Sequence, residues 1–270
     1  MDLDVLVVGS VNHDVVSRVD HLPLPGESVR ASELDSFGGG KGANQAVAAA
    51  RSGARVAMLG ATGDDEAGRG LRAELEAAGV DVGELKTVVG IPTGTAIITV
   101  DRAGENTVVV TEGANGYVGL DPQRRDLRAS VVLAQGEIPV GAIKAAAQFA
   151  AECGARFIFN AAPAPASVRD IPAGADPLIV NDTEAHTLTG IHTPSDPVEI
   201  GRELRRRSLA TSVIVTLGSS GSCLVTEDEQ LQVPAVPAEL VVDTTGAGDV
   251  YVGTLAGRLA LGDGLFAAAN

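Results

Sequence analysis

Short apolar runs alternate with longer amphipathic segments along most of this 270-residue chain. The runs at residues 5–8 and 55–59 have the length of buried strands, and the first one ends at Gly9 and Ser10. Residues 43–51 and 66–78 carry the spacing of helices. Strands that alternate with helices in this way predict a mainly parallel sheet covered by helices.

The same alternation resumes after Gly113 and continues to the end of the chain. Further strands are predicted at residues 131–133, 157–159, 178–180 and 213–215, helices at 140–152 and 246–261, and a closing hairpin from 222–225 and 230–233. We therefore expect an α/β fold with three α/β/α layers and a mainly parallel, Rossmann-like sheet.

Two segments interrupt this rhythm. Residues 12–37 contain Pro23 and Pro25, and residues 93–110 hold two β-rich runs joined by turn residues, which is typical of a hairpin. Strands without a following helix favour a small separate sheet. We predict a core of residues 1–11, 38–91 and 111–270 and a β-sheet lid of residues 12–37 and 92–110.

Composition excludes some partners. Aromatic residues make up 3% of the chain, tryptophan is absent, and the net charge is -15, so neither base stacking nor binding to a nucleic-acid backbone is expected. The one basic run, Arg205 to Arg207, is predicted to be a solvated helix face.

Cysteine, histidine and apolar patterns add no further class of site. Cys153 and Cys223 lie far apart without a CxxC pattern, which favours two buried, reduced thiols, and the four histidines lack metal-binding spacing. The apolar run at residues 5–8 is too short for a signal peptide or a membrane span. We expect a cytoplasmic protein without a membrane partner.

The run at residues 243–249, Asp-Thr-Thr-Gly-Ala-Gly-Asp, places small residues where a helix starts. Gly246, Ala247 and Gly248 leave backbone N–H groups uncovered, and these groups can form an anion hole for a phosphoryl group. Asp249 follows in the first turn and is a candidate general base, the alternative being an acidic helix-capping residue.

A second glycine-rich run, at residues 38–45, precedes the first long helix. It is not a Walker A loop because Gly42 follows Lys41, and it does not match GxGxxG because Ala43 takes the place of the third glycine. Lys41 and Asn44 supply polar side chains beside glycines that let a ligand approach the backbone closely. The residues alone therefore predict a ligand-binding loop for a hydroxyl-rich molecule or a phosphate.

Residues 38–51 and 243–249 resemble, in order and spacing, the two signature regions of the ribokinase-like (PfkB) carbohydrate kinases. The resemblance extends over nearly the whole chain through the stretches at residues 9–14, 25–27, 63–65, 92–94, 113–115, 160–166, 181–184 and 216–218. It implies transfer of a phosphoryl group from ATP to a sugar hydroxyl, with D-ribose converted to D-ribose 5-phosphate and Asp249 as base.

Other functions stay open at this point. Kinases of the same family that act on fructose, 2-keto-3-deoxygluconate, a deoxyribose or a nucleoside are alternatives, and so is a non-catalytic sugar or nucleotide sensor. A Rossmann-type dehydrogenase is disfavoured because no GxGxxG motif is present.

The resemblance also implies roles for individual residues. The sugar would contact Asn12, Asp14, Gly39, Gly40, Lys41, Asn44, Glu137 and Asp249; ATP would contact Asn181, Thr216, Gly218, Gly221 and Gly248. Asn181 and Glu184 would hold Mg²⁺ through water, and Asp243 and Thr245 would hold a monovalent cation such as K⁺. Taken singly, Asn12 also fits a turn, Glu137 a surface acid, and Asn181 with Glu184 a helix cap.

Three further expectations concern the lid and the chain end. The lid is expected to close over the sugar, with Ala96 and Ile98 as apolar contacts, and its free strand edge favours a homodimer. In the family, part of the ATP and cation sites comes from a C-terminal segment that does not follow Asn270, so we expect that the recorded sequence is cut short there.

Overall fold

The computed structural model describes residues 2–191, 196–237 and 244–270. Within these residues, nine strands form one sheet in the order β13-β12-β11-β10-β9-β8-β1-β4-β5. Its strands are β1 (Asp2–Val8), β4 (Val56–Gly63), β5 (Leu85–Val88), β8 (Arg128–Gln135), β9 (Arg156–Asn160), β10 (Leu178–Asn181), β11 (Val213–Thr216), β12 (Ser222–Val225) and β13 (Gln230–Val233).

The sheet from β11 to β5 is parallel, and the antiparallel hairpin of β12 and β13 extends it at one edge. The predicted closing hairpin is therefore confirmed. Because parallel strands end on the same side of a sheet, the residues that follow β1, β8, β9, β10 and β11 gather along one edge.

Helices cover both faces of the sheet, and β1 shows how its residues are shared between them. Leu6 and Val8 belong to the core beneath α3 (Val140–Cys153), α4 (Asp182–Thr189) and α5 (Pro197–Ser208). Val5 and Val7 point to the opposite core, beneath α1 (Lys41–Arg51), α2 (Glu66–Ala77), α6 (Ala247–Ala260) and α7 (Leu265–Ala269). The predicted three-layer α/β/α fold is confirmed.

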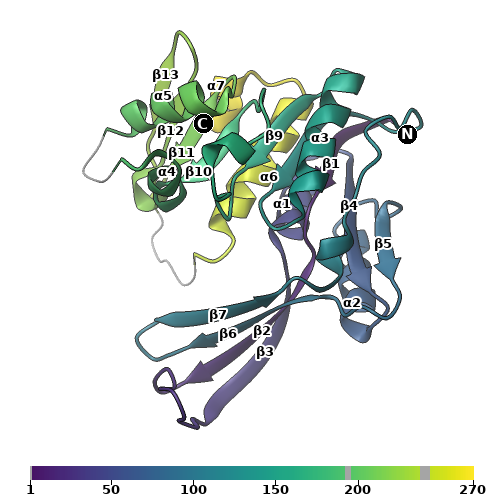
Figure 1. The fold of residues 1–270 in the computed structure, drawn as a ribbon, viewed down its shortest axis with the longest axis vertical. Coiled ribbons are helices and arrows are strands. Elements are labelled where there is room, and N and C mark those ends of the chain that lie inside the picture. The colour runs from purple at the N-terminus through teal and green to yellow at the C-terminus, as the bar shows by residue number, and fades with distance from the viewer. Residues whose placement is uncertain (1, 192–195, 238–243) are drawn as a thin grey trace.

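A second sheet projects away from this body (Figure 1). Its strands are β2 (Asn12–Val19), β3 (Ala31–Gly39), β6 (Gly94–Val100) and β7 (Asn106–Thr111), in the order β3-β2-β6-β7. The predicted hairpin of residues 93–110 is present as the antiparallel pair of β6 and β7. Nearly every residue of β3 and all of β7 are exposed, so this sheet lacks the two-sided cover of the main one.

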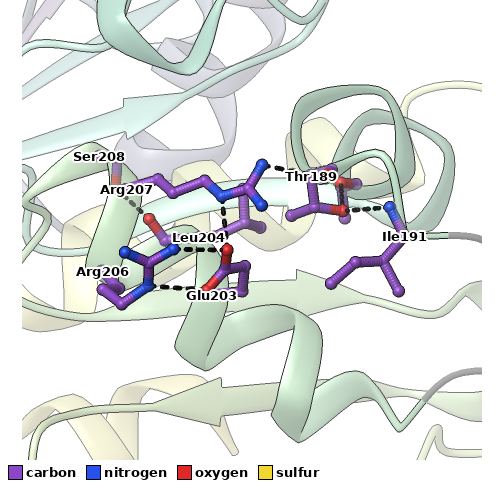
Figure 2. A network of polar contacts seen from close by, with 8 residues as sticks. Thr189, Ile191, Glu203, Leu204, Arg206, Arg207 and Ser208 are labelled. Atoms are coloured by element: carbon purple, nitrogen blue, oxygen red, sulfur yellow. Dashed lines mark hydrogen bonds and ion pairs between the residues drawn. The ribbon is translucent and has the colours of Figure 1, made fainter.

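The arginine run belongs to the last turn of α5, and intramolecular partners hold its side chains (Figure 2). Arg206 and Arg207 both donate to the Glu203 carboxylate, and these hydrogen bonds lower the pKa of Glu203 to about 2. Arg207 also donates to the Thr189 carbonyl at 2.9 Å. The run therefore ties the end of α4 to α5.

Two smaller findings refine the sequence analysis. Cys223 is buried as expected, whereas Cys153 is only half-buried because it lies in the last turn of α3. Among the described residues, no helix combines the length and the apolar character needed to cross a membrane.

Candidate active site

Polar residues end four neighbouring parallel strands at one edge of the main sheet. Gln135 of β8 is in register with Asn160 of β9, and Asn181 of β10 is in register with Thr216 of β11. Ligands of open α/β sheets bind outside the carboxyl ends of the strands. This edge is therefore the candidate site.

The glycine-rich turn between β3 and α1 packs directly against the start of β2. Gly40 has φ +88°, and a Cβ there would lie 2.8 Å from the Asn12 backbone nitrogen. A Cβ on Gly39 would lie 2.1 Å from Asp14 Oδ2. Only glycine allows this approach, which brings Asn12 and Asp14 to the start of α1.

Asn12 is the first residue of β2, so the turn interpretation is wrong. Its side chain is only 5% exposed, and its Oδ1 accepts a hydrogen bond of 2.7 Å from Asn115 Nδ2. Asn115 Oδ1 in turn accepts from the Val11 N–H at 2.9 Å. Asn115 thus orients Asn12, a role that the sequence analysis did not assign.

Asp14 carries an unsatisfied carboxylate oxygen. Its Oδ1 is buried and has no hydrogen-bond partner in the described part of the chain. Burial raises the pKa of Asp14, and the nearby Glu137 carboxylate raises it further. A buried acceptor without a donor is costly, so this oxygen points to a ligand with hydroxyl donors.

Glu137 follows β8 and is not a free surface acid. Its Oε2 accepts from Ser10 Oγ at 2.5 Å and from the Lys41 N–H at 3.0 Å. The Lys41 N–H is the first of α1, so the carboxylate satisfies an N–H group that the helix leaves unpaired. Glu137 therefore fixes the glycine-rich turn to the end of β1.

Asp249 lies in the first turn of α6 and is only 7% exposed. Its Oδ2 accepts from Asn44 Nδ2 at 3.2 Å, and its Oδ1 accepts from Gln45 Nε2 at 2.8 Å. Both donors belong to α1. A helix-capping carboxylate would accept from backbone N–H groups of its own helix, whereas the Asp249 carboxylate accepts from side chains of α1.

Two glycines let α6 approach α1 closely enough for these bonds. A Cβ on Gly253 would lie 2.3 Å from the Gln45 carbonyl oxygen, and one on Gly257 would lie 2.0 Å from Ser52 Oγ. Helices with small residues at the crossing can pack backbone against backbone. This packing carries Asp249 to the amides of α1.

The start of α6 is open above its glycines. Gly246 is the N-cap with φ +75°, and within the described residues no heavy atom lies within 4 Å of a Cβ built on Gly246 or on Gly248. The Ala247 N–H donates to the Thr244 carbonyl. Neither the Gly246 N–H nor the Gly248 N–H has a backbone acceptor among the described residues, so two of the three N–H groups in the predicted anion hole are open to a ligand.

Asn181 and Glu184 form a capping box at the start of α4. Asn181 Oδ1 accepts from the Glu184 N–H, and Glu184 Oε2 accepts from the Asn181 N–H, both at 2.8 Å. Burial raises the pKa of Glu184, the field of Lys41 opposes this, and the Asp249 charge adds to it. The helix-cap interpretation is confirmed, and the second carboxylate oxygen remains for a ligand.

This donor set fits Mg²⁺ bound through water. Groups of three or more metal-ligating side chains are absent from the described residues, so a fully protein-built cage is not available there. Mg²⁺ commonly keeps several waters and uses one or two carboxylates. Glu184 would supply such an oxygen, and its carboxylate lies in the fields of both Lys41 and Asp249.

The predicted nucleotide turn follows β11. Thr216 Oγ1 donates to the Val180 carbonyl at 3.4 Å, and Gly218 has φ +55° with open space above it. Gly221 has φ +94°, and a Cβ there would lie 1.9 Å from the Val233 carbonyl oxygen. Gly221 is therefore needed for the turn itself, whatever else it contacts.

Only one of the two predicted ligands of the monovalent cation belongs to the described residues. Asp243 lies outside the described residues, and Thr245 lies in the turn before α6. The monovalent-cation site stays a prediction.

Three buried amides near Asp249 were not among the predicted site residues. Gln45, Gln135 and Asn160 lie between α1 and the ends of β8 and β9 and bond to one another. Their signal in the sequence is weak: each is a polar residue at a position where its helix or strand is otherwise apolar.

Comparisons with known proteins agree with this geometry. The model of the pfkB family carbohydrate kinases matches residues 2–269. A bifunctional ribokinase/ribose-5-phosphate isomerase A of Fructilactobacillus sanfranciscensis is 38% identical over 94% of this chain, which spans about half (48%) of that protein. Ribokinase of Mus musculus is 37% identical over 95% of this chain and 81% of its own length.

A solved structure extends the likeness to the fold. Arabidopsis thaliana ribokinase complexed with ribose and ATP superposes with a TM-score of 0.89 at 29% identity, covering 100% of this chain and 89% of that one. Together with the family match over nearly the full length, this shows that the chain belongs to the pfkB family of carbohydrate kinases, phosphotransferases whose acceptor is a sugar hydroxyl.

Proposed function

We propose that this protein phosphorylates D-ribose with ATP, forming D-ribose 5-phosphate and ADP. The observation that carries the proposal is the Asp249 carboxylate, which is buried, held through both oxygens by α1, and placed in the first turn of α6. The relatives named ribokinase and the ribose and ATP in the Arabidopsis structure support ribose as the sugar.

In the proposed reaction, Asp249 accepts the proton of the sugar hydroxyl as its oxygen attacks the γ-phosphorus of ATP. A new phosphorus–oxygen bond forms, and the bond between the γ-phosphorus and the bridging oxygen of ADP breaks. ADP leaves with the electron pair of that bond. Because Asp249 is fixed before the sugar binds, little reorganisation is needed at the moment of transfer.

Charge on the transferring group would be stabilised from three directions. The open N–H of Gly248 and the dipole of α6 favour an anion at the helix start. Lys41 adds a positive charge from the glycine-rich turn. Mg²⁺, held by Glu184 through water, would neutralise phosphate oxygens. We also propose that ATP contacts Asn181, Thr216 and Gly218. A K⁺ ion would bind at Asp243 and Thr245.

On the sugar side, Asn12, Asp14 and the 39–44 segment would bind hydroxyl groups. Ala96 and Ile98 share a sheet face with Asp14, because Asp14 pairs with Ala96 and Val16 with Ile98. The second sheet thus presents polar residues near its base and apolar ones further out. We propose that it acts as a lid that excludes water from the reaction.

Two features of the surroundings complete the proposal. The edge strand β7 leaves its outer backbone groups unpaired, so we propose a homodimer joined through the lid sheet.

Cys153 and Cys223 are free thiols, which suits a reducing, cytoplasmic location.

A coupled ADP-release assay against a panel of sugars and nucleosides, with and without potassium, tests the function. We expect turnover with D-ribose, and Asp249→Asn should lose turnover by orders of magnitude while keeping sugar binding. Preference for fructose, 2-keto-3-deoxygluconate, a deoxyribose or a nucleoside would reassign the substrate. Binding without ADP release would indicate a sensor, and near-normal turnover of Asp249→Asn would remove Asp249 as the base.

A further inference from the structure

We infer that Gln45 is a positioning residue for Asp249, and that the Ile179 carbonyl sets the orientation of its amide through Asn160, while Gln135 donates to its oxygen. The inference rests on the proposed role of Asp249 as base. It adds a residue that has no access to either substrate, because Gln45 is completely buried.

The polarity of the network is set first at Asn160. Asn160 Nδ2 donates to the Ile179 backbone carbonyl at 3.3 Å, and a carbonyl oxygen can only accept. Asn160 therefore turns its own oxygen toward α1. Gln45 Nε2 donates to that oxygen at 2.9 Å.

The polarity is set a second time at Asp249. The same Gln45 Nε2 donates to Asp249 Oδ1 at 2.8 Å, and an ionised carboxylate can only accept. Both hydrogens of the Gln45 amide are thus used on two acceptors. The opposite orientation would put the Gln45 oxygen against two other oxygens in a buried site, which is strongly unfavourable.

Gln135 closes the network from the other side. Gln45 Oε1 accepts from Gln135 Nε2 at 2.8 Å, and Gln135 is also completely buried. Gln135 Oε1 is left without a partner among the described residues. Gly9 makes room for it, since a Cβ on Gly9 would lie 2.1 Å from this oxygen. Because Gln45 Oε1 can only accept, Gln135 must present its Nε2 to Gln45.

The consequence concerns the plane of the Asp249 carboxylate. Asn44 holds one oxygen and Gln45 holds the other, so the carboxylate cannot rotate without losing a bond. Asn44 is half-buried at the ligand side, whereas Gln45 reaches Asp249 from the protein interior. Loss of Gln45 should therefore impair the use of the base and leave sugar binding intact.

The test compares Gln45→Met and Gln135→Met with the wild-type protein in ADP release from D-ribose and ATP, together with calorimetric binding of D-ribose. We expect Gln45→Met to lower kcat about 10- to 100-fold with little change in the ribose Kd. Gln135→Met removes only the donor to Gln45 Oε1, so it should lower kcat by a smaller factor, again without loss of binding.

Thr189→Val is the matched control, because it removes only a buried hydroxyl, which bonds to the Ala185 carbonyl and the Ile191 N–H at the end of α4 opposite to Asn181. Its kcat should stay at the wild-type value even where its thermal stability falls as much as that of Gln45→Met. Equal kcat losses in Thr189→Val and Gln45→Met would overturn the inference. So would a Gln45→Met variant with wild-type kcat, or a ribose Kd that weakens in step with kcat.

If Gln45→Met does not fold, the kcat of Gln135→Met is the deciding measurement. A wild-type kcat in that variant rejects the inference. Failure of the proposed function is a separate result, because it shows as a wild-type protein that releases no ADP with D-ribose. Failure of the inference shows as an active wild-type protein whose amide variants keep their kcat.

Discussion

The Asp14 carboxylate fills the space that a side chain on Gly39 would need, since a Cβ on Gly39 would lie 2.1 Å from Asp14 Oδ2. Gly39→Ala should therefore push Asp14 out of position. We expect the KM for the sugar to rise by about 100-fold, because small displacements of positioned groups have large effects. Steady-state kinetics checks this, with Gly70→Ala, which has open space above it in α2, as the control. An unchanged KM would show that Asp14 does not contact the sugar.

The unsatisfied Asp14 carboxylate also predicts a conflict between stability and binding. Its pKa is raised in the folded protein, so folding favours the protonated form and the ionised form costs stability at neutral pH. Stability is lost as pH rises from the ordinary value of 3.8 through the raised pKa. Asp14→Asn should therefore raise Tm at pH 7, give no gain below pH 3.8, and weaken sugar binding.

Thermal melts from pH 3 to 8 with parallel calorimetry measure both effects. Asp228→Asn, at an exposed turn between β12 and β13, serves as the control. A variant that loses stability at pH 7 would contradict the prediction, because Asp14 would then have a stabilising partner.

The sequence predicted the layers and most helix bounds because apolar periodicity determines them directly. It also indicated the strands that carry site residues, since Asn181 and Thr216 each follow a short apolar run. It could not predict the Gln45 and Asn115 contacts, which join segments more than one hundred residues apart. The contact of Gln45 with Asp249 depends on the packing of α6 against α1 at Gly253, and a single sequence does not reveal which glycines permit a close approach.

Glu184 should set the Mg²⁺ requirement. Glu184→Gln keeps an oxygen that can accept from the Asn181 N–H, so the capping box and Tm should change little. The variant loses the charge, so half-saturation should require about tenfold more Mg²⁺. Initial rates at fixed ATP and varied Mg²⁺ measure this, with Glu199→Gln in the first turn of α5 as control. The same Mg²⁺ dependence in both variants would exclude Glu184 from the metal site.

Gly253 should matter for both stability and catalysis. A Cβ there would lie 2.3 Å from the Gln45 carbonyl oxygen, so Gly253→Ala should separate α6 from α1. We expect a loss of about 1–3 kcal/mol in the free energy of unfolding, as in other overpacked cores. Because Asp249 moves with α6, kcat should fall as well. Gly141→Ala, at an open position of α3, should keep the wild-type kcat and lose no stability in urea melts, because alanine favours a helix more than glycine does. Wild-type kcat in Gly253→Ala would show that the helix spacing does not control the base.

The proposed homodimer makes the last prediction. Val109 lies on the edge strand β7, is 64% exposed, and pairs with Ile97 on the sheet face opposite to Asp14. Val109→Lys places a charge on this edge without touching the sugar-facing side, so it should shift the protein from dimer to monomer. Light scattering after size-exclusion chromatography at micromolar concentration measures the mass. Val236→Lys, at an exposed position outside the lid sheet, should leave the dimer unchanged. A monomeric wild-type protein, or a dimer that survives Val109→Lys, would count against pairing through β7.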